Sequence, residues 1–226
     1  MSGIVVIGMA GGCGVTTLAC ALALRMAQPG TPPLLLDAGV HGAGPSALWG
    51  IAPARAIDDL LPLGDGITAD HLAHLTHRHP SGVDVVAGAA GPTGAVALGT
   101  AAAAAVAAHV AGRGQWVADA GMGDGPLARA LAGVAARVVA VVPATVQGAA
   151  RAGRMPHAAS GGACTVVASA LPGGHALSAR SMRAALAGRE ILAMGRDDRG
   201  ALDVAEGRAP RGRGLARTVG AVLEDA

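Results

Sequence analysis

A glycine-rich turn, Gly11-Gly12-Cys13-Gly14-Val15-Thr16-Thr17, is the part of the sequence best suited to chemistry. The apolar run 4–7 precedes it, and the helix-forming run 18–22 follows it. Glycines at a strand-to-helix turn let backbone N–H groups point inward, and the helix N-terminus adds positive potential. The turn therefore predicts a loop that binds phosphate through Gly11, Gly12, Cys13, Gly14, Val15, Thr16 and Thr17.

The turn departs at two positions from the usual phosphate-loop pattern, Gly-x-x-x-x-Gly-Lys-Ser/Thr. Met9 stands where the first glycine belongs, and Val15 stands where the lysine belongs. Gly14, Thr16 and Thr17 fit the pattern. Taken alone, the turn is equally consistent with an ordinary glycine-rich connection between a strand and a helix, so the choice depends on residues elsewhere in the chain.

Two acids stand at the ends of apolar runs. Asp37 ends the run 34–36, and Asp119 ends the run 116–118. An acid at the carboxyl end of a buried strand faces the crevice in which α/β proteins bind ligands. Each acid alone is also a common cap or turn residue. Two such acids behind a glycine-rich loop favour a ligand site, with Thr16, Asp37 and Asp119 as candidate Mg²⁺ ligands and Asp37 as the candidate catalytic residue.

Short β-branched runs alternate with Ala- and Leu-rich stretches along the chain. Strands are expected at 3–8, 34–37, 83–87, 115–119, 138–142, 165–169 and 191–194. Helices are expected at 16–27, 68–77 (with Thr68 as N-cap), 95–111, 126–135, 144–153, 178–187 and 215–223. The strands are continuous apolar runs, as in a parallel sheet that is buried on both faces. This order predicts a doubly wound, mostly parallel α/β fold in a single domain spanning residues 1–226.

The composition is that of a chain that can bury a core, since 52% of its 226 residues are apolar and 14% are charged. A disordered protein is thereby excluded. Lys, Phe, Tyr and Asn are absent, so the missing loop lysine also fits the codon usage of a GC-rich genome. The three cysteines form no metal or redox pattern and indicate a reduced, cytoplasmic setting. No run reaches the ~20 apolar residues of a membrane span, and the N-terminal run is expected to be a strand, not a signal peptide.

Four histidines lie close together at His71, His74, His77 and His79. On a helix the first three would lie partly on one face, so a zinc site is one interpretation. The favoured interpretation is a solvated helix face, with Leu72 and Leu75 turned inward.

Four arginines surround the start of the last predicted helix, at Arg208, Arg211, Arg213 and Arg217. They suggest nonspecific contacts with DNA phosphates, although a solvated basic surface is the simpler interpretation. The apolar face of the helix itself is expected to pack on the domain and not on a membrane, because Glu224 and Asp225 follow it.

Several of these segments together resemble one family. The stretch 9–17 resembles the deviant Walker A motif of the ParA/MinD ATPases, x-Lys-Gly-Gly-x-Gly-Lys-Ser/Thr-Thr. The stretch 34–39 resembles their second strand, which ends in Asp-x-Asp, and the stretch 116–120 resembles their Walker B strand, which ends in Asp-x-Pro. The run 136–143 looks like the next strand of the family. The tail 200–223 is similar to the CpaE-like branch of actinobacterial septum-site and Flp-pilus (TadZ-like) relatives.

The resemblance implies ATP or ADP with Mg²⁺ as cofactor, a homodimer, and protein partners in a septum or pilus/secretion system. Three positions depart from the family. Ala10 replaces the lysine that reaches across the dimer, Val15 replaces the loop lysine that contacts phosphates, and Gly39 replaces the acid that positions water. Each lost charge-assisted hydrogen bond weakens nucleotide binding by roughly tenfold to a hundredfold.

Catalysis is expected to suffer more than binding, because phosphoryl transfer depends on positioning and on charge compensation. The sequence therefore predicts a positioning or scaffold factor with little or no ATP hydrolysis. Two other functions stay open, namely a weak but active ATP-dependent dimerisation switch and a nucleotide-free protein-interaction module.

Overall fold

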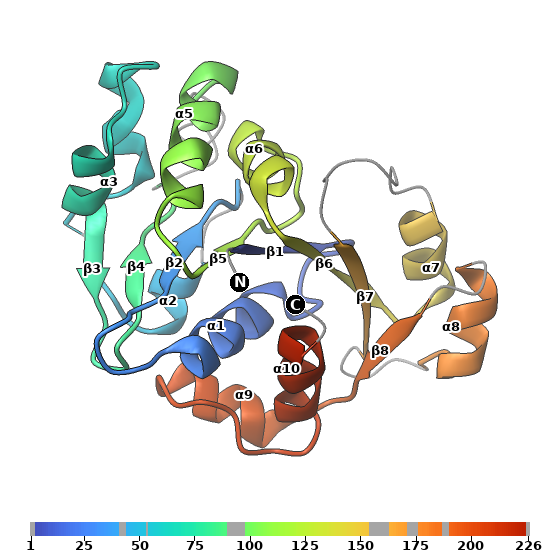
Figure 1. The fold of residues 1–226 in the computed structure, drawn as a ribbon. Coiled ribbons are helices and arrows are strands. Elements are labelled where there is room, and N and C mark those ends of the chain that lie inside the picture. The colour runs from blue at the N-terminus through green and yellow to red at the C-terminus, as the bar shows by residue number, and fades with distance from the viewer. Residues whose placement is uncertain are drawn as a thin grey trace.

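The fold is built on one eight-stranded sheet (Figure 1). The computed structural model describes residues 3–40, 44–52, 54–89, 98–153, 163–170, 176–186 and 190–224. The strands are β1 (Gly3–Gly8), β2 (Leu34–Asp37), β3 (Thr76–Arg78), β4 (Asp84–Val86), β5 (Trp116–Asp119), β6 (Arg137–Pro143), β7 (Ala163–Ser169) and β8 (Ile191–Met194). Their spatial order is β3-β4-β2-β5-β1-β6-β7-β8, and all neighbours are parallel except β3 and β4. The predicted doubly wound, mostly parallel α/β fold is confirmed.

Helices cover both faces of this sheet (Figure 1). They are α1 (Val15–Met26), α2 (Pro45–Leu48), α3 (Ala69–Leu75), α5 (Thr100–Ala111), α6 (Pro126–Val134), α7 (Val146–Gly153), α8 (Ala179–Ala185), α9 (Asp198–Ala205) and α10 (Leu215–Glu224), with the 3-10 helix η1 (Ile57–Leu63) before α3. One face packs on α1 and α10, and the other on α3, α5 and α6. Alternate residues of a strand therefore belong to different cores, as Val5 and Val6 of β1 do.

The central strands pack closely because a glycine makes room for the largest side chain. Gly3 of β1 lies in register with Trp116 of β5. A Cβ on Gly3 would overlap the indole ring of Trp116, which is fully buried. Trp116, the first residue of β5, thereby fills the core on one face of the sheet. Asp119 is the last residue of the same strand.

The predicted helix 68–77 is wrong at its C-terminal end. Thr68 caps α3 as expected, but α3 ends at Leu75, and His77 lies in β3, which pairs antiparallel with β4. Thr76 favours an extended backbone because it is β-branched, and the ladder to Val86 holds it there. The elements α2, η1, β3 and α9 were not predicted from the sequence. Residues 95–97 of the predicted helix 95–111, and residue 187 of the helix 178–187, lie outside the described residues.

The last predicted helix is confirmed as α10, and its apolar face packs on the domain. Leu215, Val219 and Val222 are buried in the same core as α1. Among the described residues, no helix is both long and apolar enough to cross a membrane.

Candidate functional site

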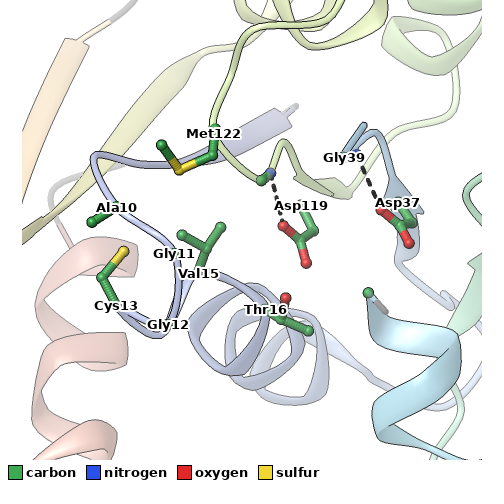
Figure 2. A pocket seen from close by; sticks show the side chains of 12 residues that line it. Ala10, Gly11, Gly12, Cys13, Val15, Thr16, Asp37, Gly39, Asp119 and Met122 are labelled. Atoms are coloured by element: carbon green, nitrogen blue, oxygen red, sulfur yellow. Dashed lines mark hydrogen bonds between the residues drawn. The ribbon is translucent and has the colours of Figure 1, made fainter. Parts of the chain in front are cut away.

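The glycine-rich turn follows β1 directly and opens α1 (Figure 2). Gly12 (φ 71°) and Gly14 (φ 96°) adopt the left-handed backbone conformation that glycine tolerates best. A Cβ at Gly11 or Gly12 would meet no atom within 4 Å, so the turn borders open space. Among the described residues, no side chain caps the N-terminus of α1 at Gly14. The positive end of this helix thus lies free beside the turn, as an anion site requires.

A cavity of about 450 Å³ lies over this turn (Figure 2). This volume suits a small ligand. The cavity is lined by the turn and by the ends of neighbouring strands: Ala10, Gly11, Gly12, Cys13, Val15, Thr16, Asp37, Gly39, Gly44, Asp119, Gly121 and Met122. These described lining residues include two carboxylates and no basic side chain. Most of the predicted loop residues lie here, but Gly14 and Thr17 do not.

Thr17 lines a second cavity of about 220 Å³ instead. This cavity shares Gly12 with the first and extends to the carboxyl ends of β7 and β8, at Ser169 and Met194. It also reaches Arg196, whose Nε donates to Asp198 Oδ1 at 2.8 Å. The sequence reading did not assign these strand ends to the site.

The two predicted acids sit side by side on neighbouring strands. Asp37 of β2 and Asp119 of β5 are partners in the parallel ladder. Each begins the tripeptide Asp-Ala-Gly, and each carboxylate accepts a hydrogen bond from the glycine N–H two residues later. The distance from nitrogen to Oδ1 is 3.1 Å for Gly39 and 3.0 Å for Gly121 (Figure 2). The ladder therefore brings both acids to the same wall of the cavity.

Asp37 is enclosed by backbone. Its side chain is bordered by Gly39, Gly44 and Gly88, and a Cβ on either of the last two would overlap the carboxyl group. Asp37 is only 6% exposed. Burial, with the neighbouring Asp119 charge, raises the pKa of Asp37 to about 7, although N–H groups of Gly39 and Gly88 oppose the shift.

Asp119 differs from Asp37 in having a hydroxyl among its described neighbours. Thr16, on the first turn of α1, lies near the Asp119 carboxylate, and its hydroxyl favours the ionised form. Burial raises the pKa of Asp119, and the bonds from Thr16 and from the Gly121 N–H oppose the rise. The candidate Mg²⁺ ligands Thr16, Asp37 and Asp119 all line one cavity.

Apolar packing occupies the positions where the sequence lacks lysines. Val15 is only 8% exposed, and its Cγ2 packs so closely on Gly8 that a Cβ there would come within 2.6 Å. Cys13 donates its thiol hydrogen to the Val141 carbonyl at 3.6 Å, and burial raises the pKa of this thiol. Small buried side chains thus anchor the turn, and none of the described residues that line the cavity over it is basic.

The four histidines do not converge. His71 bonds to Thr68 through Nδ1, His74 bonds to the Asp70 carbonyl, and His77 bonds to the Arg55 carbonyl. His79 stacks on Trp49, with ring centroids 4.5 Å apart. Within the described ranges, no three His, Cys, Asp or Glu residues are placed to hold a metal ion. Leu72 and Leu75 are buried as expected, but the favoured interpretation, a solvated helix face, holds only for His71 and His74, because α3 ends at Leu75 and His77 belongs to β3.

Two of the four C-terminal arginines serve the fold. Arg208 and Arg211 both donate to Asp203 Oδ1 at 3.2 Å, and Asp203 is 3% exposed. These two arginines therefore compensate the charge of a buried carboxylate. Asp197, the N-cap residue directly before α9, accepts hydrogen bonds from the N–H groups of Gly200 in α9 and Leu215 in α10. One carboxylate thus caps two helices. An acid just after a strand and before a helical run is a start signal that the sequence reading missed.

Comparison with known proteins agrees with this fold. No protein-family model matches the chain, and no curated protein matches it in sequence. Solved structures do match over nearly the whole chain. A ParA family ATPase from Chlorobium tepidum TLS has a TM-score of 0.76 and 14% identity, with 96% of this chain and 95% of that chain covered.

Two further structures are similar to the same extent. The McdA(D38A)–ATP complex from Cyanothece has a TM-score of 0.73 and 16% identity, covering 99% of this chain and 96% of that chain. The septum site-determining protein MinD with Mg-ADP, from Pyrococcus horikoshii OT3, has a TM-score of 0.74 and 14% identity, covering 99% and 95%. The chain has the P-loop fold of the ParA/MinD ATPases.

Proposed function

We propose that this protein binds a nucleotide and acts as a positioning or scaffold factor, with little or no ATP hydrolysis. The observation that carries the proposal is the cavity over the glycine-rich turn. It combines an uncapped helix N-terminus with Thr16 and two carboxylates, yet its described lining contains no cation. Such a site retains the parts that hold phosphate and lacks the parts that promote its transfer.

The residues present fit a magnesium nucleotide. The open space over Gly11 and Gly12 leaves room for phosphate oxygens, which the residues from Gly11 to Thr17 would hold through backbone N–H groups. Thr16, Asp37 and Asp119 offer the oxygen ligands that Mg²⁺ prefers. When bound, the metal would supply the positive charge that offsets the phosphates and both acids.

Three positions argue against efficient turnover. Val15 and Ala10 place no charge near the phosphates, and Gly39 offers only its N–H, which already donates to Asp37. Phosphoryl transfer needs fixed charges and an oriented nucleophile. Binding through backbone groups survives the loss of a lysine, but with an affinity weaker by roughly tenfold to a hundredfold.

The biological role that we infer is the placement of another assembly. The fold is shared with a protein described as septum site-determining, and the tail resembles the CpaE-like branch. We propose a cytoplasmic protein, one domain over residues 1–226, that forms a homodimer and serves a septum or pilus/secretion system. Arg213 and Arg217 remain the candidates for nonspecific DNA contacts, since Arg208 and Arg211 are bound to Asp203.

Calorimetric titration of ATP and ADP, with and without Mg²⁺, tests the proposal. The wild type should bind weakly and only with Mg²⁺, and Val15→Lys should bind roughly tenfold or more tightly. Val15→Met is the matched control, because it adds length without charge, and it should bind like the wild type. Hydrolysis as fast as in lysine-containing relatives would rule out the proposal that this protein hydrolyses little or no ATP. No binding at all would favour the nucleotide-free interaction module.

One observation favours a second candidate function, an ATP-dependent dimerisation switch. Two candidate metal ligands, Thr16 and Asp119, interact with each other at the wall of the cavity. Such a switch predicts dimers that form with Mg·ATP and disappear in Thr16→Ala and Asp119→Ala. Analytical ultracentrifugation measures this directly, and equal sedimentation with and without Mg·ATP would exclude the switch.

A further inference from the structure

An arginine from another part of the chain reaches the glycine-rich turn. Arg151 lies on α7, and its Nη1 donates to the Met9 carbonyl at 2.9 Å. Met9 is also tied to β6, because its N–H donates to the Val141 carbonyl at 2.9 Å. Met9 directly precedes Ala10, which lines the cavity. The guanidinium of Arg151 therefore lies beside the first residue of the cavity wall.

The charge around the cavity is unbalanced. Asp37 and Asp119 both line it, and no described lining residue is basic. Arg151 is exposed, and in the described part of the chain it forms no ion pair with a carboxylate. Its one contact given by the structure is with a neutral carbonyl group. A neutral acceptor holds a guanidinium less strongly than an anion does.

We propose that Arg151 is the cation of this phosphate site, replacing the lysines that the turn lacks. Its guanidinium leaves the Met9 carbonyl and donates to phosphate oxygens of a nucleotide bound over the turn. A neutral acceptor is exchanged for a charged one, and the planar fork of arginine suits phosphate. This inference rests on the proposed nucleotide binding and names the residue that makes it effective.

A purely structural role is the competing explanation. Arg151 would then only clasp the turn to α7, and its hydrogen bond, not its charge, would matter. Substitutions at Arg151 distinguish a role of its charge from a role of its hydrogen bond. Arg151→Gln removes the charge and keeps an N–H donor on a shorter side chain. Arg151→Ala removes both, and Arg151→Lys keeps the charge.

The experiment is calorimetric titration of the full chain with Mg·ADP and Mg·ATP. We expect Arg151→Gln and Arg151→Ala to lose affinity equally, by roughly 10- to 100-fold, and Arg151→Lys to bind more tightly than either. Arg183→Gln is the matched control. It removes the same charge from the adjacent helix α8, where the Arg183 side chain makes no hydrogen bond or ion pair among the described residues, and it should bind like the wild type. Thermal unfolding without nucleotide should be the same for the wild type, Arg151→Lys and Arg183→Gln, whereas Arg151→Ala should lose only the small contribution of its hydrogen bond to the Met9 carbonyl.

Two results would overturn the inference while nucleotide binding itself stands. If Arg151→Gln binds like the wild type and only Arg151→Ala loses affinity, Arg151 acts only through its hydrogen bond to the Met9 carbonyl. Equal losses in Arg151→Gln and Arg183→Gln would show a general effect of net charge. A wild type that binds neither nucleotide would overturn the proposed function as well, so the two failures are distinguishable.

Discussion

The two Asp-Ala-Gly turns at the ends of β2 and β5 are identical in sequence and differ in environment. Both carboxylates are more than nine-tenths buried, and both accept a bond from the glycine two residues later. The Thr16 hydroxyl also lies near Asp119 and lowers its pKa, whereas Asp37 is enclosed by glycine backbone. The ionised form is therefore better supported at Asp119. Equal local sequence does not give equal acidity, because the neighbours that decide it come from other segments.

The largest expected effect is on the pH dependence of stability. The folded chain keeps a proton on Asp37 up to a pH of about 7, whereas the unfolded chain releases it near the ordinary value of 3.8. The free energy of unfolding should therefore fall as the pH rises from about 4 to above 7, by roughly 2–4 kcal/mol from this group. Asp37→Asn should remove this part of the slope. Denaturant unfolding at several pH values measures it, and parallel profiles for wild type and variant would contradict the assignment.

The next effect concerns the glycine enclosure of Asp37. A Cβ on Gly44 would overlap the carboxyl group, so Gly44→Ala must displace either α2 or Asp37. We expect a loss of ~1–3 kcal/mol in the free energy of unfolding. Gly11→Ala is the control, because a Cβ there meets nothing within 4 Å and Gly11 has no left-handed backbone. If both variants unfold at the same denaturant concentration, the glycines around Asp37 do not contribute to the free energy of unfolding.

The smallest effect is expected at the Thr16 hydroxyl. Thr16→Val removes the hydroxyl that favours ionised Asp119 but keeps the shape of the side chain, and should cost ~1–2 kcal/mol near neutral pH. The loss should shrink in acid, where Asp119 is protonated, and Thr16→Ser should largely retain the stability. Unfolding at pH 7 and pH 4 tests the point. A loss that is the same at both pH values would mean that packing, and not the charge of Asp119, is responsible.

The elements that the sequence predicted well are the apolar ones. The runs 3–8, 34–37 and 191–194 match β1, β2 and β8 residue for residue, because continuous apolar runs between turn residues leave few alternatives. The missed elements are short or polar. The strand β3 has only Thr76, His77 and Arg78, and pairing with β4 decided its conformation. The helix α9 begins with charged residues and depends on the Asp197 cap.

The features of the candidate site also fall into those that the sequence predicts and those that only the tertiary structure decides. The sequence alone determined the glycine turn, the two acids at strand ends and the missing lysines, since each is a local pattern of residue types. Only the tertiary structure decided that Asp37 and Asp119 face one cavity, that Gly44 and Gly88 enclose one acid while Thr16 serves the other, and that Arg151 reaches Met9 across 142 positions of the chain. The physical reason is that electrostatic and packing forces act through space, between segments that no local pattern connects.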